Sequence, residues 1–392
     1  MTRRECISCL PFSGALVEAQ MTANEKIAVA AQRTFGLHLL RDIVDRKPGE
    51  NVFISPLSVF LALQMTENGA AGATRTAMRK ALTLPDLDAV KLNASSAALQ
   101  SMLKAKASLT IANALWADQH FTLAPDFVKL CESSFGARAA SLNFADPKAA
   151  DQINDWVKTN TNGKIGSIVT PDIVKKAAVI LTNAVYFAAQ WRSEFAVSAT
   201  ADEPFHKTGG AAKTVKMMHQ SRLTGAYRSG ANFEGAMLYY KESSAFFYAL
   251  LPQSGHTPTD VLASLDPARF TTAPTDFDLD LKLPRFTLDF SASLVEYLKK
   301  MGMDVAFHYP GADFSPMGSR DFFISDVLHK TRLEIDENGT VAAAATAVIM
   351  RAGAAMRQQR PTKTLVFDRP FVALIADSQT GALLFAGVIE DP

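Results

Sequence analysis

The hydrophobic residues in the first part of this chain recur mainly at helical spacing. The segment 24–45 carries them on one side of a predicted amphipathic helix, at Ile27, Phe35, Leu39 and Ile43. A second helix is predicted over 58–68, with Gly69 as its stop. Asp146 followed by proline is typical of a cap and a first helical turn, which predicts a third helix over 147–159. The first part is therefore expected to be largely helical.

From about residue 179 onward the pattern changes to that of β-strands. The stretch 179–187 is an apolar run rich in strand-forming residues, and 371–375 and 383–389 flank the polar turn 377–381 as in a hairpin. The segment 277–283 alternates strictly, with one apolar face made of Phe277, Leu279, Leu281 and Leu283. Helices followed by strands, without alternating crossovers, predict an α+β fold with largely antiparallel sheets.

Charge and hydrophobicity exclude several classes of protein. The 40 basic and 39 acidic residues leave a formal net charge of +1, so no overall field steers the chain toward nucleic acid or an anionic membrane. No uncharged stretch reaches the roughly 20 residues that a membrane-spanning helix requires. With 48% hydrophobic residues, we expect a globular protein with a sizeable core, and neither a nucleic-acid nor a membrane partner.

The sequence carries no motif for catalysis, a cofactor or a metal. It lacks GxSxG, GxxxxGK[ST], GxGxxG and HExxH, so nothing predicts an activated nucleophile or a phosphate-binding loop. The seven histidines do not fall into HxxxH or HxH spacing. Three cysteines allow at most one disulfide, and Cys6 and Cys9 form an isolated CxxC. We therefore expect no enzyme activity, no metal and no cofactor.

Residues 1–23 allow two interpretations. Two arginines precede a mildly apolar stretch, 6–16, and 17–19 loosely fits a small-residue cleavage site, as in a secretory signal peptide. Glu5 and Pro11 argue against a signal and favour a flexible N-terminus. A signal would predict an extracellular or periplasmic protein, and its absence a cytoplasmic one.

One uncharged segment, 338–350, is compatible with two secondary structures. It contains four consecutive alanines, and alanine is the best helix former. Its alternate residues are small or apolar, so it could also enter a sheet with one face buried: Thr340, Ala342, Ala344, Thr346, Val348 and Met350. Gly339 provides a hinge that tolerates a large backbone change. A segment competent in both states is what a conformational switch requires.

Six short motifs occur in a fixed order along most of the chain. They are 51–58 (NVFISPLS), 182–195 (TNAVYF, then Trp191 and Phe195), 215–218 (VKMM), 283–286 (LPRF), 327–340 (VLHK through ENGT) and 369–387 (RPF, then TGALLFAG). Each resembles a serpin segment. Their shared order and spacing, from about residue 25 to the end, identify the chain as a member of the serpin family.

The resemblance implies about nine helices around three mainly antiparallel β-sheets, in a single domain over 24–392, with an exposed reactive-centre loop at about 338–362. Inhibitory serpins are monomeric suicide substrates of serine proteases: the protease acylates itself on the loop, which then inserts into the main sheet as a new strand. The matching hinge residues are Glu337, Gly339, Thr340, Ala342 and Ala344. The positions expected to face inward on insertion, Thr340, Ala342 and Ala344, carry no charge. This favours an inhibitor over the alternative, a non-inhibitory serpin with a binding or chaperone-like role.

The resemblance also suggests where the target protease cuts. Counted from Glu337 in the family manner, the scissile bond is Gly353–Ala354. The loop is several residues longer than in many relatives, so four other reactive residues stay open: Met350, Arg351, Met356 and Arg357. The small residues around 353 favour an elastase- or subtilisin-like target, whereas either arginine would suit a trypsin-like one.

Four further residues match family positions in the region where the main sheet opens. Ser55, Asn183 and His329 match a polar network beneath that sheet, and Trp191 matches a position near its top, where the loop first enters. Without the resemblance, His329 and Trp191 would be interpreted as ordinary core residues.

Overall fold

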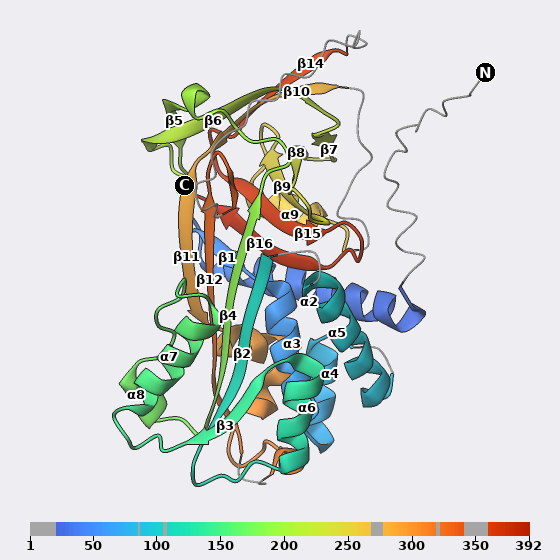
Figure 1. Ribbon diagram of the computed structural model, residues 1–392, viewed down its shortest axis with the longest axis vertical. Coiled ribbons are helices and arrows are strands. Elements are labelled where there is room, and N and C mark those ends of the chain that lie inside the picture. Colours follow the sequence, from blue (N-terminus) through green and yellow to red (C-terminus); the bar gives the residue numbers. More distant parts are fainter. Residues whose placement is uncertain (1–20, 85–86, 105–107, 268–276, 319–321, 341–359) are drawn as a thin grey trace, which may run out of the picture.

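The computed structural model (Figure 1) describes residues 21–84, 87–104, 108–267, 277–318, 322–340 and 360–392. In these ranges the chain forms nine α-helices: α2 (Ala23–Arg46), α3 (Pro56–Glu67), α4 (Gly72–Ala81), α5 (Ala89–Lys104), α6 (Pro125–Phe135), α7 (Ala149–Asn160), α8 (Pro171–Lys175), α9 (Pro258–Ser264) and α10 (Val295–Leu298). The N-terminal segment 1–20 and most of the expected loop, 341–359, lie outside the described residues.

Sixteen strands accompany these helices in the described ranges. They are β1 (Val52–Ile54), β2 (Ser108–Asp118), β3 (Arg138–Leu142), β4 (Val179–Gln190), β5 (Ala201–His206), β6 (Ala212–Thr224), β7 (Tyr227–Ser229), β8 (Phe233–Tyr239), β9 (Ala245–Pro252), β10 (Asp278–Pro284), β11 (Phe286–Ser293), β12 (Ile324–Ile335), β13 (Gly339–Thr340), β14 (Thr362–Val366), β15 (Phe371–Asp377) and β16 (Leu383–Ile389).

The strands form three sheets, as the sequence predicted. The main sheet has the order β11-β12-β13-β4-β2-β3, a second six-stranded sheet the order β1-β16-β15-β9-β8-β7, and a four-stranded sheet the order β14-β10-β6-β5. Pairing is antiparallel except for β10–β14, β12–β4 and β2–β3. The prediction of an α+β fold with mainly antiparallel sheets is therefore confirmed.

Both faces of the main sheet are covered where β4 crosses the molecule. Leu181 and Val185 of β4 belong to the large core that includes the side chains of α3. Ile180 and Ala184 face the other way, into two smaller clusters under α7. Figure 1 shows α7 and α8 on one side of β4 and helices α3 to α6 on the other. Because both faces are buried, the sequence of β4 is continuously apolar rather than alternating.

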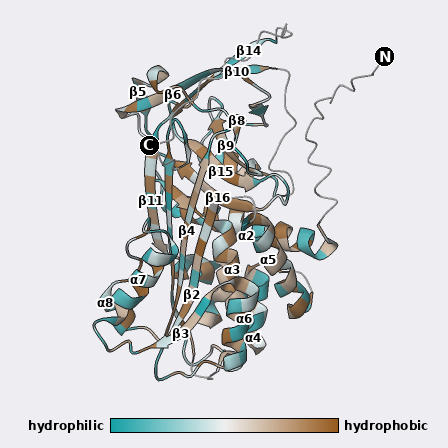
Figure 2. Ribbon diagram, in the orientation of Figure 1, coloured by the Kyte–Doolittle hydropathy of each residue, from teal (hydrophilic) through white to brown (hydrophobic). Residues whose placement is uncertain are grey.

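The most apolar elements lie at the centre of the molecule. Every residue of the antiparallel hairpin β15–β16 is buried, which confirms the hairpin predicted for this part of the chain. Every residue of α3 is also buried, so this helix has no solvent-facing stripe. Figure 2 shows these three elements largely in brown, the colour of hydrophobic residues.

Several expected boundaries and positions were wrong. Helix α7 begins at Ala149 rather than at 147, because Asp146 caps the turn before it through a bond from the Lys148 N–H, 2.9 Å long. Strand β2 was not predicted. Phe277 and Ile27 were both expected on apolar faces. Phe277 instead precedes β10 and is 36% exposed, and Ile27 of α2 is 41% exposed.

The length, spacing and burial of the described residues bear on three features: a membrane-spanning helix, a metal-binding cluster and a reactive cysteine. None of their helices combines the length and the apolar character that crossing a membrane demands. They contain no group of three or more His, Cys, Asp or Glu side chains placed to hold a metal ion. Cys131 is a buried free cysteine, and burial raises the pKa of its thiol to about 12; it is therefore an unreactive core residue. Cys6 and Cys9 lie outside the described residues.

Candidate functional site: the open end of the main sheet

The end of β12 turns back on itself and re-enters the main sheet. After Ile335 the chain reverses direction over 336–338 and returns as β13 between β12 and β4. There Thr340 pairs antiparallel with Ile335 on one side and with Ala189 on the other. Farther along the sheet, β12 and β4 pair directly with each other, in parallel, from 324–332 to 179–186. The main sheet is thus split at one end, with Gly339 and Thr340 in the split.

The turn itself is held by the side chain of Asp336. Its Oδ1 accepts bonds from the backbone N–H groups of Asn338 and Gly339, at 2.8 and 3.0 Å. The backbone N–H of Asp336 donates to the Gly339 carbonyl at 2.9 Å. A Cβ atom at position 339 would lie only 2.2 Å from the Ala189 carbonyl oxygen. Glycine is therefore required here by the close approach of β4.

The segment that follows β4 binds the outer side of the turn. The Trp191 N–H donates to the Asn338 carbonyl at 2.8 Å, and the Phe195 N–H donates to the Glu337 carbonyl at 2.9 Å. The indole Nε1 of Trp191 donates to the Asp336 carbonyl at 2.9 Å. All three carbonyls of the turn are consequently satisfied by one neighbouring segment, which fixes the turn in place.

Glu337 is buried although it carries a carboxylate. Its side chain accepts a bond from Thr200 Oγ1 at 2.8 Å and lies 3.6 Å from the guanidinium of Arg285. Arg285 follows β10 and is itself about half exposed. The ion pair therefore connects the hinge turn to the four-stranded sheet. Removing either partner would leave the other without its opposite charge.

Thr340 lies deepest of the described hinge residues. It is fully buried, and its hydroxyl is 2.6 Å from the hydroxyl of Tyr240. The Tyr240 ring stacks on Trp191 with centroids 4.6 Å apart and planes 11° apart. Burial raises the pKa of Tyr240, so this hydroxyl stays protonated. Sequence reasoning missed Tyr240, because it is 100 residues from its partner and belongs to none of the motifs.

A separate polar network lies under the same sheet, where β12 and β4 are paired. The structure brings Ser55, Asn183 and His329 together there. The Ser55 N–H donates to His329 Nε2 at 3.0 Å, and the other ring nitrogen bonds to the Asn183 side chain. Asn183 also bonds to Ser58 and to Asn113 of β2. Ser58 and Asn113 complete the network but were not among the predicted residues.

The geometry fixes the protonation of His329. A backbone N–H can only donate, so Nε2 accepts from Ser55, and the ring proton lies on Nδ1, directed at the Asn183 carbonyl oxygen. The residue is fully buried, and this burial lowers the pKa of the imidazole to about 3. His329 is therefore a neutral crosslink between β12, β4 and the start of α3.

The predicted site residues thus fall into two groups. Glu337, Gly339, Thr340 and Trp191 meet at the split end of the sheet, and Ser55, Asn183 and His329 meet farther along it. Ala342, Ala344 and all of the candidate reactive residues lie outside the described residues: Met350, Arg351, Gly353, Ala354, Met356 and Arg357.

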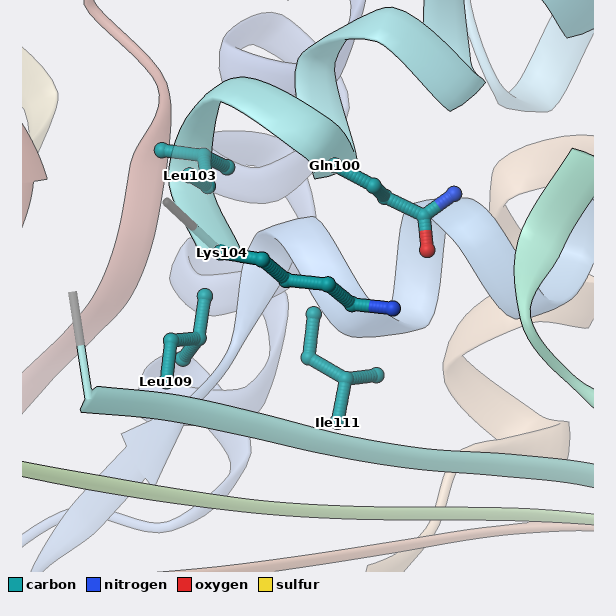
Figure 3. A pocket seen from close by; sticks show the side chains of 5 residues that line it. All are labelled: Gln100, Leu103, Lys104, Leu109 and Ile111. Atoms are coloured by element: carbon teal, nitrogen blue, oxygen red, sulfur yellow. The ribbon is translucent and has the colours of Figure 1, made fainter. Parts of the chain in front are cut away.

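A small gap between α5 and β2 is not a second site. Figure 3 shows Lys104 of α5 extending across it, with Gln100 and Leu103 from the same helix and Leu109 and Ile111 from β2. These side chains fill the gap so closely that no space for a water-sized molecule is left. The lining is mainly aliphatic, as expected for a packed helix–sheet contact.

Comparison with known proteins defines the class. A family model described as Serpin (serine protease inhibitor) matches residues 30–392. The chain therefore belongs to the serpin family, and it is a protease inhibitor rather than an enzyme.

Two sequence relatives and two solved structures illustrate the similarity. Leukocyte elastase inhibitor of Bos taurus is 32% identical over 380 residues, covering 93% of this chain and 99% of that protein. An uncharacterised serpin-like protein of Thermococcus kodakarensis is 33% identical over 379 residues, covering 94% and 87%. The crystal structure of the thermophilic serpin tengpin in its native state aligns with a TM-score of 0.84 at 30% identity, covering 95% of each chain. Human thyroxine-binding globulin complexed with its ligand aligns at 0.83 and 26% identity, covering 94% of this chain and all of that one.

Proposed function

We propose that this chain inhibits serine proteases as a suicide substrate, by inserting its cleaved reactive-centre loop between β12 and β4. The observation that carries the proposal is β13, because Gly339 and Thr340 already occupy the first positions of such a strand. The insertion would continue along the slot that β13 has opened. It would replace one parallel pairing, β12–β4, with two antiparallel ones, which are slightly more stable per residue.

The register of β13 supports the proposed role of the hinge alanines. Continued without a shift, it brings Ala342 opposite Leu333 of β12 and Phe187 of β4, two residues beyond the observed pairs of Thr340. Ala344 would then lie opposite Thr331 and Val185. All four of these strand residues are buried. Small side chains fit such a slot, whereas a charge would cost several kcal/mol.

The energy released by insertion is sufficient for a mechanical role. About a dozen new strand residues would form ladder bonds worth roughly 0.5–1.5 kcal/mol each in net terms. The sum is on the order of 10 kcal/mol, comparable to the whole stability of an ordinary domain. A protease attached covalently to the moving loop would be carried with it.

The reactive bond that we propose is Gly353–Ala354, with Met350, Arg351, Met356 and Arg357 as alternatives. Small residues at this bond suit an elastase- or subtilisin-like protease, and the similarity to leukocyte elastase inhibitors supports the elastase-like choice. Cleavage after Arg351 or Arg357 would instead indicate a trypsin-like target.

The proposal is tested by incubating the protein with a panel of elastase-, subtilisin- and trypsin-like proteases. We expect a covalent complex that survives boiling in detergent. Intact-mass measurement of the released C-terminal peptide then identifies the reactive bond. If every protease yields only cleaved protein, at any ratio, the chain is instead a non-inhibitory serpin with a binding or chaperone-like role.

A substitution at the hinge tests insertion itself. Thr340→Arg introduces a charge at a fully buried position, so the cleaved loop should fail to insert and the inhibitor should become a substrate. The measurement is the ratio of detergent-stable complex to cleaved protein. Thr364→Arg, the same change at an exposed residue of β14 beyond the loop, is the matched control. Unchanged complex formation by the Thr340 variant contradicts insertion.

A further inference from the structure

We propose that Tyr240 is a positioning residue for loop insertion: its hydroxyl holds Thr340 between β12 and β4 in the uncleaved protein, so that the new strand grows from an end that is already docked. This inference rests on the proposed function and adds to it a residue outside the loop, the hinge and the polar network under the sheet. Tyr240 lies between β8 and β9, far from Thr340 in the sequence.

The bond between Tyr240 and Thr340 is the only side-chain anchor of β13 in the part of the chain that the structure describes. Gly339 has no side chain, and the Thr340 hydroxyl has no other partner there than Tyr240. β13 pairs with one residue of β12 and two of β4. So short a strand gains little from its ladder, and a buried hydroxyl pair therefore contributes a large part of what holds it.

Tyr240 cannot follow Thr340 out of the sheet, because two aromatic neighbours hold its ring in place. One face stacks on Trp191, and Phe187 of β4 contacts the ring at a centroid distance of 5.0 Å and an interplanar angle of 65°. A backbone bridge also joins Tyr240 to Trp191. If Thr340 leaves, both hydroxyls lose their bond while Tyr240 stays buried. Undocking is thereby made unfavourable by the unsatisfied phenol as well as by the lost ladder.

Docking before cleavage matters because insertion competes with hydrolysis of the acyl-enzyme. If the first inward-facing residue is already in place, the loop skips the step in which its free end must find the slot. Without the Tyr240 hydroxyl, a larger fraction of molecules would start undocked. More acyl-enzyme would then be hydrolysed before the protease is displaced, and more inhibitor would be consumed for each protease trapped.

Tyr240→Phe tests this, because it removes the hydroxyl and keeps the ring that stacks on Trp191. Using a protease from the panel that forms the complex, we expect the number of inhibitor molecules consumed per protease trapped to rise severalfold. Hydrogen–deuterium exchange in the uncleaved protein should be about tenfold faster at residues 335–340, the change expected from losing one buried bond. Tyr297→Phe, the same change at a buried tyrosine of α10, is the control.

A double-mutant cycle separates positioning from a general loss of stability. Thr340→Val removes the other hydroxyl at nearly the same volume and should resemble Tyr240→Phe. The double variant should be no worse than either single one, because both remove the same bond. The inference is overturned if Tyr240→Phe lowers the melting temperature but leaves both exchange at 335–340 and inhibitor consumption at wild-type values, or if the two substitutions act additively. If the wild-type protein traps no protease, the proposed function fails, while exchange in the uncleaved protein still decides whether Tyr240 docks the hinge.

Discussion

His329 shows at the scale of one residue how the closed part of the sheet depends on a neutral side chain. Its Nε2 accepts from the Ser55 N–H, and a second proton on the ring would bring two hydrogens into conflict there. In the unfolded chain the imidazole takes up that proton below about pH 6.5. In the folded protein burial keeps it neutral to about pH 3. Low pH therefore lowers the stability of the folded protein through this residue.

We expect the free energy of unfolding to fall as the pH is lowered from 6.5. The unfolded state then binds one more proton than the folded state, which costs about 1.4 kcal/mol per pH unit, or about 2 kcal/mol at pH 5. His329→Gln should be less stable at pH 7 but should lose this part of the pH dependence. Urea unfolding at pH 5, 6 and 7 measures both effects. The exposed His206→Gln is the control, and an unchanged slope in the His329 variant would show that this residue is not the source.

Position 339 must be glycine, because its α-carbon lies against the β4 backbone and leaves no room for a side chain. In Gly339→Ala, the new Cβ would lie 2.2 Å from the Ala189 carbonyl oxygen, so β13 must shift. We expect a loss of about 1–3 kcal/mol of stability, as for other overpacked sites, and faster amide exchange at 335–340. Gly166→Ala, where a Cβ meets nothing within 4 Å, is the matched control. Wild-type exchange in the Gly339 variant would contradict the tight fit.

At the scale of elements, the sequence patterns predicted the helices and strands that have a single hydrophobic pattern and are bounded by turn residues. The strand at 179–187 and the hairpin at 371–389 were found because their apolar runs are bounded by turns. Strand β2 was missed because it is an interior strand, between β4 and the edge strand β3, and is covered on both faces: Ala112, Ala114, Leu115 and Trp116 are all buried. Its sequence therefore neither alternates nor follows a helical period.

The candidate site was only partly predictable from the sequence. The family motifs supplied Ser55, Asn183 and His329, which no local pattern would have joined. Tyr240 and Thr200 had no signal, because their contacts to the hinge cross 100 and 137 residues of chain. Partners of this kind are fixed by the packing of separate sheets, and a single sequence contains no periodic trace of that packing.

At the scale of the whole molecule, the proposed mechanism requires that the uncleaved fold is not the most stable one. Cleavage within the loop, for instance at 353–354, should allow a full strand to enter the main sheet. We expect the melting temperature to rise by about 10 °C or more, given an added stability on the order of 10 kcal/mol. Differential scanning calorimetry of intact and cleaved protein measures the change. An unaltered melting temperature, after cleavage is verified by mass, would contradict the mechanism.

The tightly bonded turn at 336–339 also bears on how the protein is produced. Asn338-Gly339-Thr340 is a glycosylation sequon, yet the Asn338 backbone is bonded through both its N–H and its carbonyl, and the Thr340 hydroxyl is buried. An oligosaccharide could thus be attached only before the chain folds, during secretion through a eukaryotic host. Such a sugar would occupy the entrance to the slot, so material from a bacterial cytoplasm is the appropriate source for inhibition assays.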